Sequence, residues 1–591
     1  MRKFAQFAEP ILRILSPKRR SALLVICLFT VGMGLVEMGV AGSISLLGIA
    51  MSSPSTLTSF PGYNKFLELC VFLPDSLSPM LRMLIITMGL VCICITIKNT
   101  LFALLTWRQN CFSNNVAWDC MLNLYASYLR APYVWHVQQN SADLQLYLTW
   151  KYYISTLINN VITAISQFSV AIILIGATVF VAGKLALLTF VIIAVVGIII
   201  YRLFRTKAQT LGQKVRGMDE IASRGTLGSL HGIREVRIYS TAQQFYNSIA
   251  NMQSLYVHTS SIRDLMGSVP QWILESLGML LLLGVLICMA FSGTSDGHAV
   301  GVMTLLAAAC WRMLPAVNKF LGALLCLKVY FPYLQKVLKK LDEVPLDEKM
   351  LQQEMISFNK SIVMQNVDYS YSSESPLALN GVSVNIPKGK MIGIVGKSGS
   401  GKSSLIGVLS GLLSPGAGKL LVDGKAVLPG QSLSLGYVPQ SIYLVDATLA
   451  ENVGFSDWGQ SVDRARVLES CKMASLDVAS LFPEGIDTQI GERGVRLSGG
   501  QIQRVGIARA LYSRPDVLIF DESTSAMDSA TESAIQDTIL SLRANVTLII
   551  VAHRLTTVTA CDYVYWLDNG VIQMSGTANE ILPCYEEFLK K

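Results

Sequence analysis

The chain has few charged residues for its length. They make up 15% of its 591 residues, whereas apolar residues make up 52%. Soluble globular proteins carry about 25% charged residues. The apolar residues gather before about residue 330, and the remainder has an ordinary globular composition. The composition therefore argues against a single soluble domain and predicts a membrane part followed by a soluble part.

Paired cysteines are also missing. The twelve cysteines are scattered, and no two have the spacing of a metal site. Several, such as Cys92, Cys94 and Cys288, lie inside apolar runs. We interpret them as small buried side chains in a reducing compartment rather than as metal ligands or disulfide partners.

The N-terminus lacks the features of a secretory signal peptide. The apolar run from Ser21 to Met51 is too long for one and has no small-residue cleavage site. Six cations precede this run, and they contribute to a net charge of +8: Arg2, Lys3, Arg13, Lys18, Arg19 and Arg20. We interpret them as the cytoplasmic flank of a first membrane helix, not as a nucleic-acid surface.

Six apolar segments are long enough to cross a bilayer, near 21–47, 82–107, 154–182, 184–204, 268–292 and 301–327. An even number places both termini on the cytoplasmic side of a multi-pass protein. We therefore expect an all-α transmembrane domain of six helices over 1–345, a linker over 346–358, and an α/β P-loop ATPase domain over 359–591. The charged helix that continues from the last span should end at Pro345.

The connections between spans differ in length. Residues 108–153 and 205–267 are long and charged, which predicts helical extensions into the cytoplasm. Breaks after Pro132 and at Gly232 predict a short transverse helix at the tip of each extension. On the outer side, 64–72 has the pattern of a short amphipathic helix, which is equally typical of an ordinary loop helix.

A phosphate-binding loop follows a short apolar strand at 391–395. The loop reads Gly-Lys-Ser-Gly-Ser-Gly-Lys-Ser from Gly396 to Ser403, and a helix is predicted over 404–412. Its glycines let backbone N–H groups point at an anion near a helix N-terminus. Lys402 is expected to reach the β- and γ-phosphates, and Ser403 to hold Mg²⁺. The remaining nucleotide-binding candidates here are Gly396, Ser398, Gly399, Gly401 and Ser404.

A second apolar strand, 517–520, ends in two acids. Asp521 is placed to hold Mg²⁺ through water. Glu522 is placed to polarise the attacking water as a general base. A pair of acids at a strand end is often only a surface feature, but after a phosphate loop it predicts nucleotide hydrolysis.

With these motifs, 361–591 resembles the nucleotide-binding domain of an ATP-binding-cassette (ABC) transporter. The resemblance implies that Tyr371 stacks on adenine and that Gln440 reaches Mg²⁺. It implies that His553 contacts the γ-phosphate and that Asp528 lies in the D-loop, next to a methionine where leucine is commoner. ATP and Mg²⁺ are the cofactors that it implies.

The segment Leu497–Gln501 resembles the signature loop of that family. In the family this loop faces the nucleotide held by a second copy, so the resemblance implies a homodimer with two composite sites. The residues that would contact the partner's ATP are Ser498, Gly499, Gly500 and Gln501. A stretch around Glu492 resembles the exporter branch, where it contacts the transverse helices; Tyr133 and Glu235 are the corresponding coupling candidates.

Ionisable residues inside spans are expensive and are therefore candidates for substrate contact. Lys98 and Arg312 are the two we single out. Lys98 and Lys319 can alternatively reach the interface or lie in a cytoplasmic extension. Glu37 and Glu275 can alternatively pair with those cations and hold the helices together.

The sequence around Arg312 resembles a subgroup that includes the bacterial lipid-linked oligosaccharide flippase. That resemblance implies ATP-driven flipping of a polyprenyl-pyrophosphate glycan across the inner membrane. Gln271 departs from the subgroup, where a cation is common. Two alternatives remain open, an exporter of peptide, lipid or hydrophobic drug and a membrane-anchored ATPase or regulator.

Overall fold

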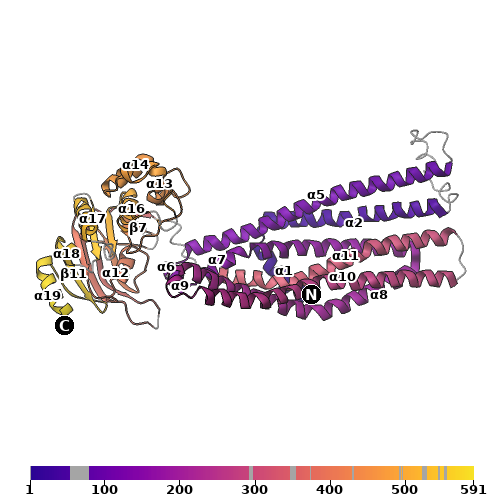
Figure 1. The fold of residues 1–591 in the computed structure, drawn as a ribbon, viewed down its shortest axis with the longest axis horizontal. Helices are drawn as coiled ribbons and strands as arrows, with labels where there is room; N and C mark the ends of the chain where they lie inside the picture. The colour runs from indigo at the N-terminus through magenta and orange to yellow at the C-terminus, as the bar shows by residue number, and fades with distance from the viewer. Residues whose placement is uncertain are drawn as a thin grey trace. The chain divides into compact units, whose positions relative to one another are not determined.

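A computed structural model describes residues 2–52, 79–291, 297–345, 354–372, 375–428, 431–491, 494, 497–521, 529–543, 546–551 and 555–590. The chain divides into two compact units (Figure 1). The first comprises Met1–Leu129 and Gln139–Val344, and the second comprises Arg130–Gln138 and Pro345–Lys591. The segment Arg130–Gln138 thus belongs with the C-terminal part of the chain although it lies between helices of the first unit in sequence.

The first unit is built from long helices, as expected. They are α1 (Arg2–Ile14), α2 (Pro17–Ser52), α5 (Pro79–Arg130), α7 (Ser141–Thr149), α8 (Lys151–His231), α9 (Ile233–Ile238), α10 (Ala242–Phe291) and α11 (Gly297–Glu343). Helix α11 ends two residues before Pro345, where the sequence predicts its end.

Helix α8 contains two of the predicted spans and folds back on itself. Asp219 interacts with Tyr153, although a straight α-helix would separate them by roughly 100 Å. Likewise Arg224 Nη2 lies 2.7 Å from Asp143 Oδ2, just before the start of α8. The two arms of α8 are therefore antiparallel, in agreement with separate spans at 154–182 and 184–204.

Four helical stretches in the described part of the chain are long and apolar enough to cross a membrane: Pro17–Ile44, Leu84–Arg130, Ser141–Phe180 and Met313–Glu343. Each overlaps one of the six predicted spans in part. The other two, 184–204 and 268–292, lie in parts of α8 and α10 that include side chains outside the description. The predicted outer helix at 64–72 also lies outside the described residues.

The structure has a short helix after each of the two predicted breaks. Helix α6 (Tyr133–Gln138) starts directly after Pro132, and α9 starts after Gly232. Proline lacks the N–H that a continuing helix would need, which ends α5 at this point. Within the second unit, Val134 of α6 packs against the buried cluster formed by the strands.

The second unit contains a six-stranded sheet in the order β12-β11-β4-β10-β9-β8 and an antiparallel sheet in the order β3-β2-β5-β6. In the larger sheet only β12 is antiparallel to its neighbour. Its strands are β4 (Met391–Val395), β8 (Leu435–Val438), β9 (Val517–Asp521), β10 (Thr547–Val551), β11 (Tyr563–Asp568) and β12 (Val571–Gly576).

The smaller sheet contains β2 (Ser361–Tyr369), β3 (Leu379–Pro387), β5 (Ala417–Val422) and β6 (Lys425–Ala426). Strand β1 (Glu354–Ile356) lies inside the predicted linker and pairs with β7 (Gln431–Leu433). The helices are α12 (Lys402–Leu409), α13 (Leu449–Val453), α14 (Arg464–Met473), α15 (Val478–Leu481), α16 (Gly499–Tyr512), α17 (Ser529–Leu542), α18 (Leu555–Val558) and α19 (Ala578–Lys590), with short 3-10 turns at Phe455–Asp457 and Gly485–Asp487.

Both faces of the larger sheet are buried. In β4, Met391 and Val395 join one hydrophobic cluster, and Ile392 and Ile394 join another. Strands β9 and β10 alternate in the same way. Strands covered on both faces read as continuous apolar runs, which is why the sequence located them. Because β4, β8, β9 and β10 are parallel, the segments that follow them emerge at one edge.

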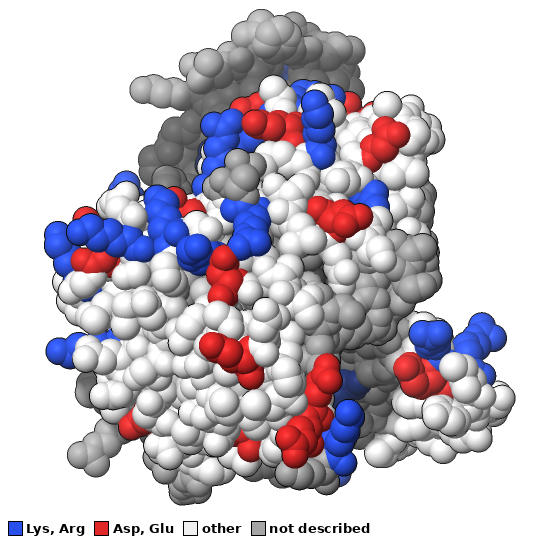
Figure 2. All heavy atoms as spheres, turned by 90° about the vertical axis from the view of Figure 1, so that its left-hand side faces the viewer, with Lys and Arg blue, Asp and Glu red and all other residues white. Residues whose placement is uncertain are grey.

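Charges of both signs share the face of the molecule in Figure 2, where Lys and Arg side chains are interspersed with Asp and Glu. In the second unit Arg464 pairs with Asp487 at 2.6 Å, and Arg514 pairs with Glu469 at 3.1 Å. Many of the cations behind the net charge of +8 therefore have acidic neighbours.

Candidate functional site

The phosphate loop joins β4 to α12, and three of its glycines are required by geometry. A Cβ on Gly396 would lie 2.2 Å from Leu567 O, and one on Gly401 would lie 2.5 Å from Ala378 O. Gly399 and Gly401 have φ angles of +80° and +105°, which favour glycine. Any other residue at these positions would have to distort the loop.

Lys402 lies at the centre of this loop and is 6% exposed. Its Nζ donates to the carbonyl oxygens of Gly396 at 2.8 Å and Lys397 at 2.9 Å. The nearby Ser400 Oγ is buried and makes no hydrogen bond within the described part of the chain. A buried ammonium group and a buried hydroxyl group beside a helix N-terminus fit a phosphate group.

The predicted adenine-stacking residue is close to the same helix. Tyr371 Oη and Ser404 Oγ are 3.0 Å apart, and the Tyr371 ring packs edge-on against Tyr369. The Tyr371 side chain is 45% exposed, which leaves ring surface accessible for a flat base. Ser398 and Ser403 are exposed at the loop and at the second residue of α12.

The acidic part of the site is at the end of β9. Asp521 Oδ2 accepts a hydrogen bond of 3.0 Å from Tyr437 Oη, because β8 and β9 pair in parallel with Val438 opposite Phe520. Gln440 follows β8 at the same edge and is exposed. A carboxylate, an amide oxygen and the Ser403 hydroxyl are hard oxygen donors, a set that fits Mg²⁺.

Tyr437 also lies close to Tyr133 of α6. Burial raises the pKa of Tyr437, and the Asp521 carboxylate and the neighbouring Tyr133 phenol raise it further. Tyr437 therefore remains a protonated donor at neutral pH. Tyr133 and Val134 of α6 both belong to the second unit, so the residue predicted for coupling is near the residue that donates to Asp521. Sequence reasoning missed the role of Tyr437, since its contact with Asp521 depends on strand register.

The segment predicted as the signature loop caps α16. Gln501 N donates to Ser498 Oγ at 3.3 Å, and Ser498 N donates to Gln501 Oε1 at 2.8 Å, which is a capping box. The Gln501 side chain therefore has a helix-capping role within the protomer in addition to its predicted contact with nucleotide. A Cβ on Gly499 would meet no atom within 4 Å, so the helix end is open at Gly499.

Arg509 is a residue that the sequence analysis missed. It lies on α16 and donates to Tyr443 O at 2.8 Å, Asn452 O at 2.7 Å and Asn452 Oδ1 at 3.0 Å. Burial lowers the pKa of Arg509 to about 10, which keeps it charged at neutral pH. These hydrogen bonds link α16, whose N-cap is Ser498, to the segment that follows Gln440.

Several predicted site residues lie outside the described residues, and their roles remain predictions. They are Glu522, His553, Asp528 and Glu492. Glu235 is exposed on α9.

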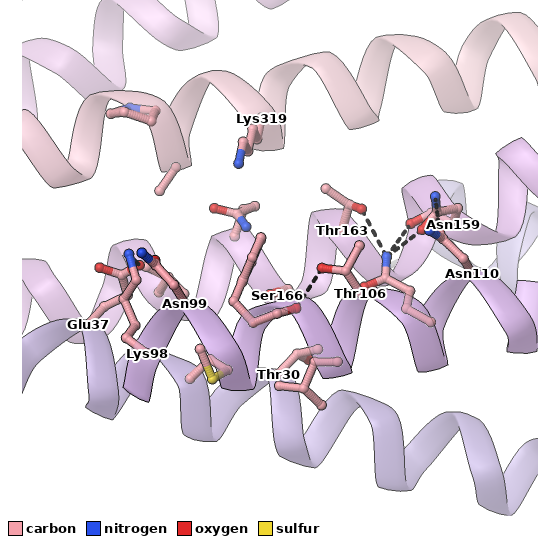
Figure 3. Close-up of a pocket in the computed structure, with 18 residues that line it drawn as sticks. Thr30, Glu37, Lys98, Asn99, Thr106, Asn110, Asn159, Thr163, Ser166 and Lys319 are labelled. Atoms are coloured by element: carbon pink, nitrogen blue, oxygen red, sulfur yellow. Dashed lines mark hydrogen bonds and ion pairs between the residues drawn. The ribbon is translucent and has the colours of Figure 1, made fainter. Parts of the chain in front are cut away.

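A second candidate site lies in the first unit. A cavity of about 570 Å³ lies among α2, α5, α8 and α11 and is lined by Lys98, Glu37 and Lys319 (Figure 3). Lys98 Nζ is 3.4 Å from Glu37 Oε1, so the alternative role of ion pairing applies to these two. Arg312 lies in α11, but its side chain is outside the described part. Glu275 accepts from Gln271 at 2.7 Å, and Gln271 accepts from Asn318 at 3.1 Å.

Comparison with known sequences identifies the second unit. Residues 379–525 match the family described as ABC transporter. An ATP-dependent lipid A-core flippase of Photobacterium profundum is 38% identical over 229 residues, 38% of this chain and 39% of that protein. A flippase of the same description from Francisella tularensis subsp. holarctica is 29% identical over 366 residues, 60% and 59% of the two chains.

A heterocyst differentiation ATP-binding protein, HepA of Nostoc sp., is 38% identical over 228 residues, 38% of this chain and 37% of that protein. The alignments thus span less than two thirds of the length of these relatives. The solved structure of a bacterial Atm1-family ABC exporter with ATP bound matches with a TM-score of 0.76 at 20% identity. That match covers 97% of this chain and 99% of the other. The predicted fold class, a helical membrane domain followed by an ABC ATPase domain, is confirmed.

Proposed function

We propose that this chain, in which an ABC ATP-binding domain follows a helical domain with the exporter fold, hydrolyses ATP to export or flip an amphiphilic lipid. The observation that supports this most is the edge of the parallel sheet. That edge holds the buried Lys402, Asp521 and the segment that contains Gln440. The same chain has helices long enough to span a bilayer. ATP supplies the transferable γ-phosphoryl group, and the oxygen ligands at this edge suit Mg²⁺.

The working unit we propose is a homodimer in the cytoplasmic membrane, with both termini and the ATPase domain in the cytoplasm. The support is the open end of α16. The first N–H groups of a helix lack intrahelical acceptors, and a Cβ on Gly499 would meet no atom within 4 Å, so an anion held by another copy could bind there. Each ATP would then lie between Lys402 of one protomer and Ser498–Gly500 of the other.

Mixed dimers test this arrangement. Gly499→Asp is compatible with the fold, because the site has room for a Cβ and an acid suits a helix N-terminus, but it repels a facing phosphate. We expect Gly499→Asp and Lys402→Ala homodimers to lose vanadate-dependent nucleotide trapping. A dimer of one chain of each kind keeps one composite site with both native elements, and we expect it to trap about half as much nucleotide as wild type.

The control is a mixed dimer in which both substitutions lie on the same chain and the other chain is native. There each composite site has one altered element, and we expect no trapping. Equal trapping by the two kinds of mixed dimer would contradict the shared site.

Tyr437→Phe tests whether the Tyr437 hydroxyl positions Asp521. The substitution keeps the ring and removes the donor to Asp521 Oδ2. Partners of metal-binding groups typically affect metal affinity by about 10–100-fold. We expect the Mg²⁺ concentration for half-maximal ATPase activity to rise by about tenfold.

Tyr443→Phe is the matched control, since Tyr443 contributes a backbone carbonyl to Arg509 and its side chain is 60% exposed. The same Mg²⁺ dependence in both variants would show that the Tyr437 hydroxyl has no part in positioning Asp521.

The cargo that we propose is lipid-linked, most specifically a polyprenyl-pyrophosphate oligosaccharide. The support is the cavity with cationic and amide side chains inside a membrane bundle, together with relatives that are named lipid flippases. A charged headgroup costs about 3–17 kcal/mol to place in hydrocarbon, and a polar cavity lowers that cost.

Reconstitution into liposomes tests the cargo. We would measure ATPase activity with lipid-linked glycans, short peptides and hydrophobic dyes side by side. Stimulation by peptides or dyes alone would favour the alternative of a peptide or drug exporter.

A further inference from the structure

Helix α19 packs on the strand beside the phosphate loop (Figure 1). Strand β11 pairs in parallel with β4 and places Trp566 opposite Val395, the residue directly before the loop. The Trp566 ring centroid lies 5.5 Å from that of Tyr585 and 4.9 Å from that of Phe588, both on α19. Tyr585 is 5% exposed and belongs to the same buried cluster as Trp566. Helix α19 therefore covers the point at which β4 ends and the loop begins.

Two side chains of α19 reach the loop itself. Lys397 Nζ lies 4.1 Å from the centroid of the Phe588 ring, which is within the range of a cation–π interaction. The N–H group of Gly396 faces the Tyr585 hydroxyl group. Burial raises the pKa of Tyr585 above its ordinary value, although the Gly396 N–H group acts in the opposite direction, so the phenol stays protonated at neutral pH. One helix thus contacts two consecutive residues of the loop.

The same two loop residues hold Lys402. Their carbonyl oxygens accept from Lys402 Nζ at 2.8 Å for Gly396 and 2.9 Å for Lys397. Glycine has more backbone freedom than any other residue, so a contact from outside the loop restricts Gly396 where it has no side chain to do so. A loop that is already ordered loses less conformational freedom when it binds its ligand. Contacts from α19 should therefore strengthen the binding of a phosphate group.

We infer that α19 positions the first two residues of the phosphate loop and thereby increases the affinity for ATP, with Phe588 on the Lys397 ammonium group and Tyr585 on the Gly396 N–H group. Both act through the loop, so they are positioning residues and not catalytic ones. The inference rests on the proposed binding of ATP at this loop and adds two determinants of affinity that lie outside the nucleotide-binding motifs.

A double-mutant cycle on the full chain in nanodiscs tests the contact between Phe588 and Lys397. We would measure the Kd of a fluorescent ATP analogue for wild type, Phe588→Leu, Lys397→Met and the double variant. Phe588→Leu should raise the Kd about two- to fivefold, and Phe588→Tyr, which keeps an aromatic ring, should restore it. The double variant should lose less affinity than the product of the two single losses. Losses that multiply, or a wild-type Kd for Phe588→Leu, would overturn the inference for this contact.

Tyr585→Phe tests the second contact, because it keeps the ring on Trp566 and removes the hydroxyl group. We expect the KM for ATP to rise about three- to tenfold while kcat stays within about twofold of wild type, since binding is weakened before and during the reaction alike. A purely structural role would reduce the folded fraction instead. A fall in kcat with an unchanged KM would therefore contradict positioning by Tyr585.

Leu589→Ala and Tyr563→Phe are the matched controls. Leu589 is 45% exposed on α19, and the Tyr563 hydroxyl group donates to Ser575 of β12 at 3.3 Å. Both controls should have wild-type Kd and KM values. If the α19 variants match these controls while Lys402→Ala loses affinity, the inference fails and the proposed ATP site stands. If Lys402→Ala also binds the analogue like wild type, the proposed ATP site at this loop fails too.

Discussion

Replacing Glu522 with glutamine should nearly stop phosphate release while ATP still binds. Glu522 directly follows Asp521 at the end of β9, where a carboxylate can polarise the attacking water. The amide keeps the size of the side chain but cannot accept the proton. General-base catalysis contributes about 10²–10⁴-fold, and we expect a loss of this order in the rate of phosphate release. Phosphate release and retention of labelled ATP would be measured on the same protein.

Glu469→Gln is a suitable control for this variant. Glu469 is exposed on α14 and pairs with Arg514 at the surface. It is distant in sequence from Asp521 and Glu522. Loss of the Glu469 carboxylate should not alter the rate of ATP hydrolysis. Wild-type phosphate release from Glu522→Gln would contradict the assignment of the base.

Replacing Lys402 with alanine should weaken ATP binding about 10–100-fold. The buried Nζ lies at the centre of the phosphate loop, and hydrogen bonds from a charged donor are worth about 1.5–3 kcal/mol. The substitution also leaves the carbonyl groups of Gly396 and Lys397 without this donor. A titration with a fluorescent ATP analogue measures the loss, and circular dichroism checks that the fold is retained.

Lys425→Ala provides the comparison, since it removes a lysine of the same unit that is exposed on β6. Equal affinities of the two variants for the analogue would mean that Lys402 does not contact phosphate.

The strands that position these residues were predictable from the sequence. Strand β4 has the bounds that its apolar run predicts, and β9 begins at the predicted residue, because both faces of these strands are buried. The helix after the loop was placed less well. It spans Lys402–Leu409 rather than 404–412, since Gly401 with φ of +105° starts it at once and Gly411 with φ of +74° follows its end. These φ angles are not evident from the residue types alone.

Contacts between distant elements were not predictable in the same way. Pairing of Lys98 with Glu37 was one of two open alternatives, because it depends on how α2 and α5 are rotated about their axes. The hydrogen bond from Tyr437 to Asp521 depends on the register of β8 against β9. The second role of Gln501 could have been anticipated, since Ser-Gly-Gly-Gln fits the pattern of a capping box.

The membership of Arg130–Gln138 in the second unit has a consequence for biogenesis. The ribosome makes this segment long before strand β1, so it has to remain available while the remaining helices are inserted. The second unit cannot complete its packing around Val134 until its own strands have been synthesised and have returned to this segment. Packing of Arg130–Gln138 into the second unit is therefore a late, non-local folding step, of the kind that is slow and exposes apolar surface to misassembly.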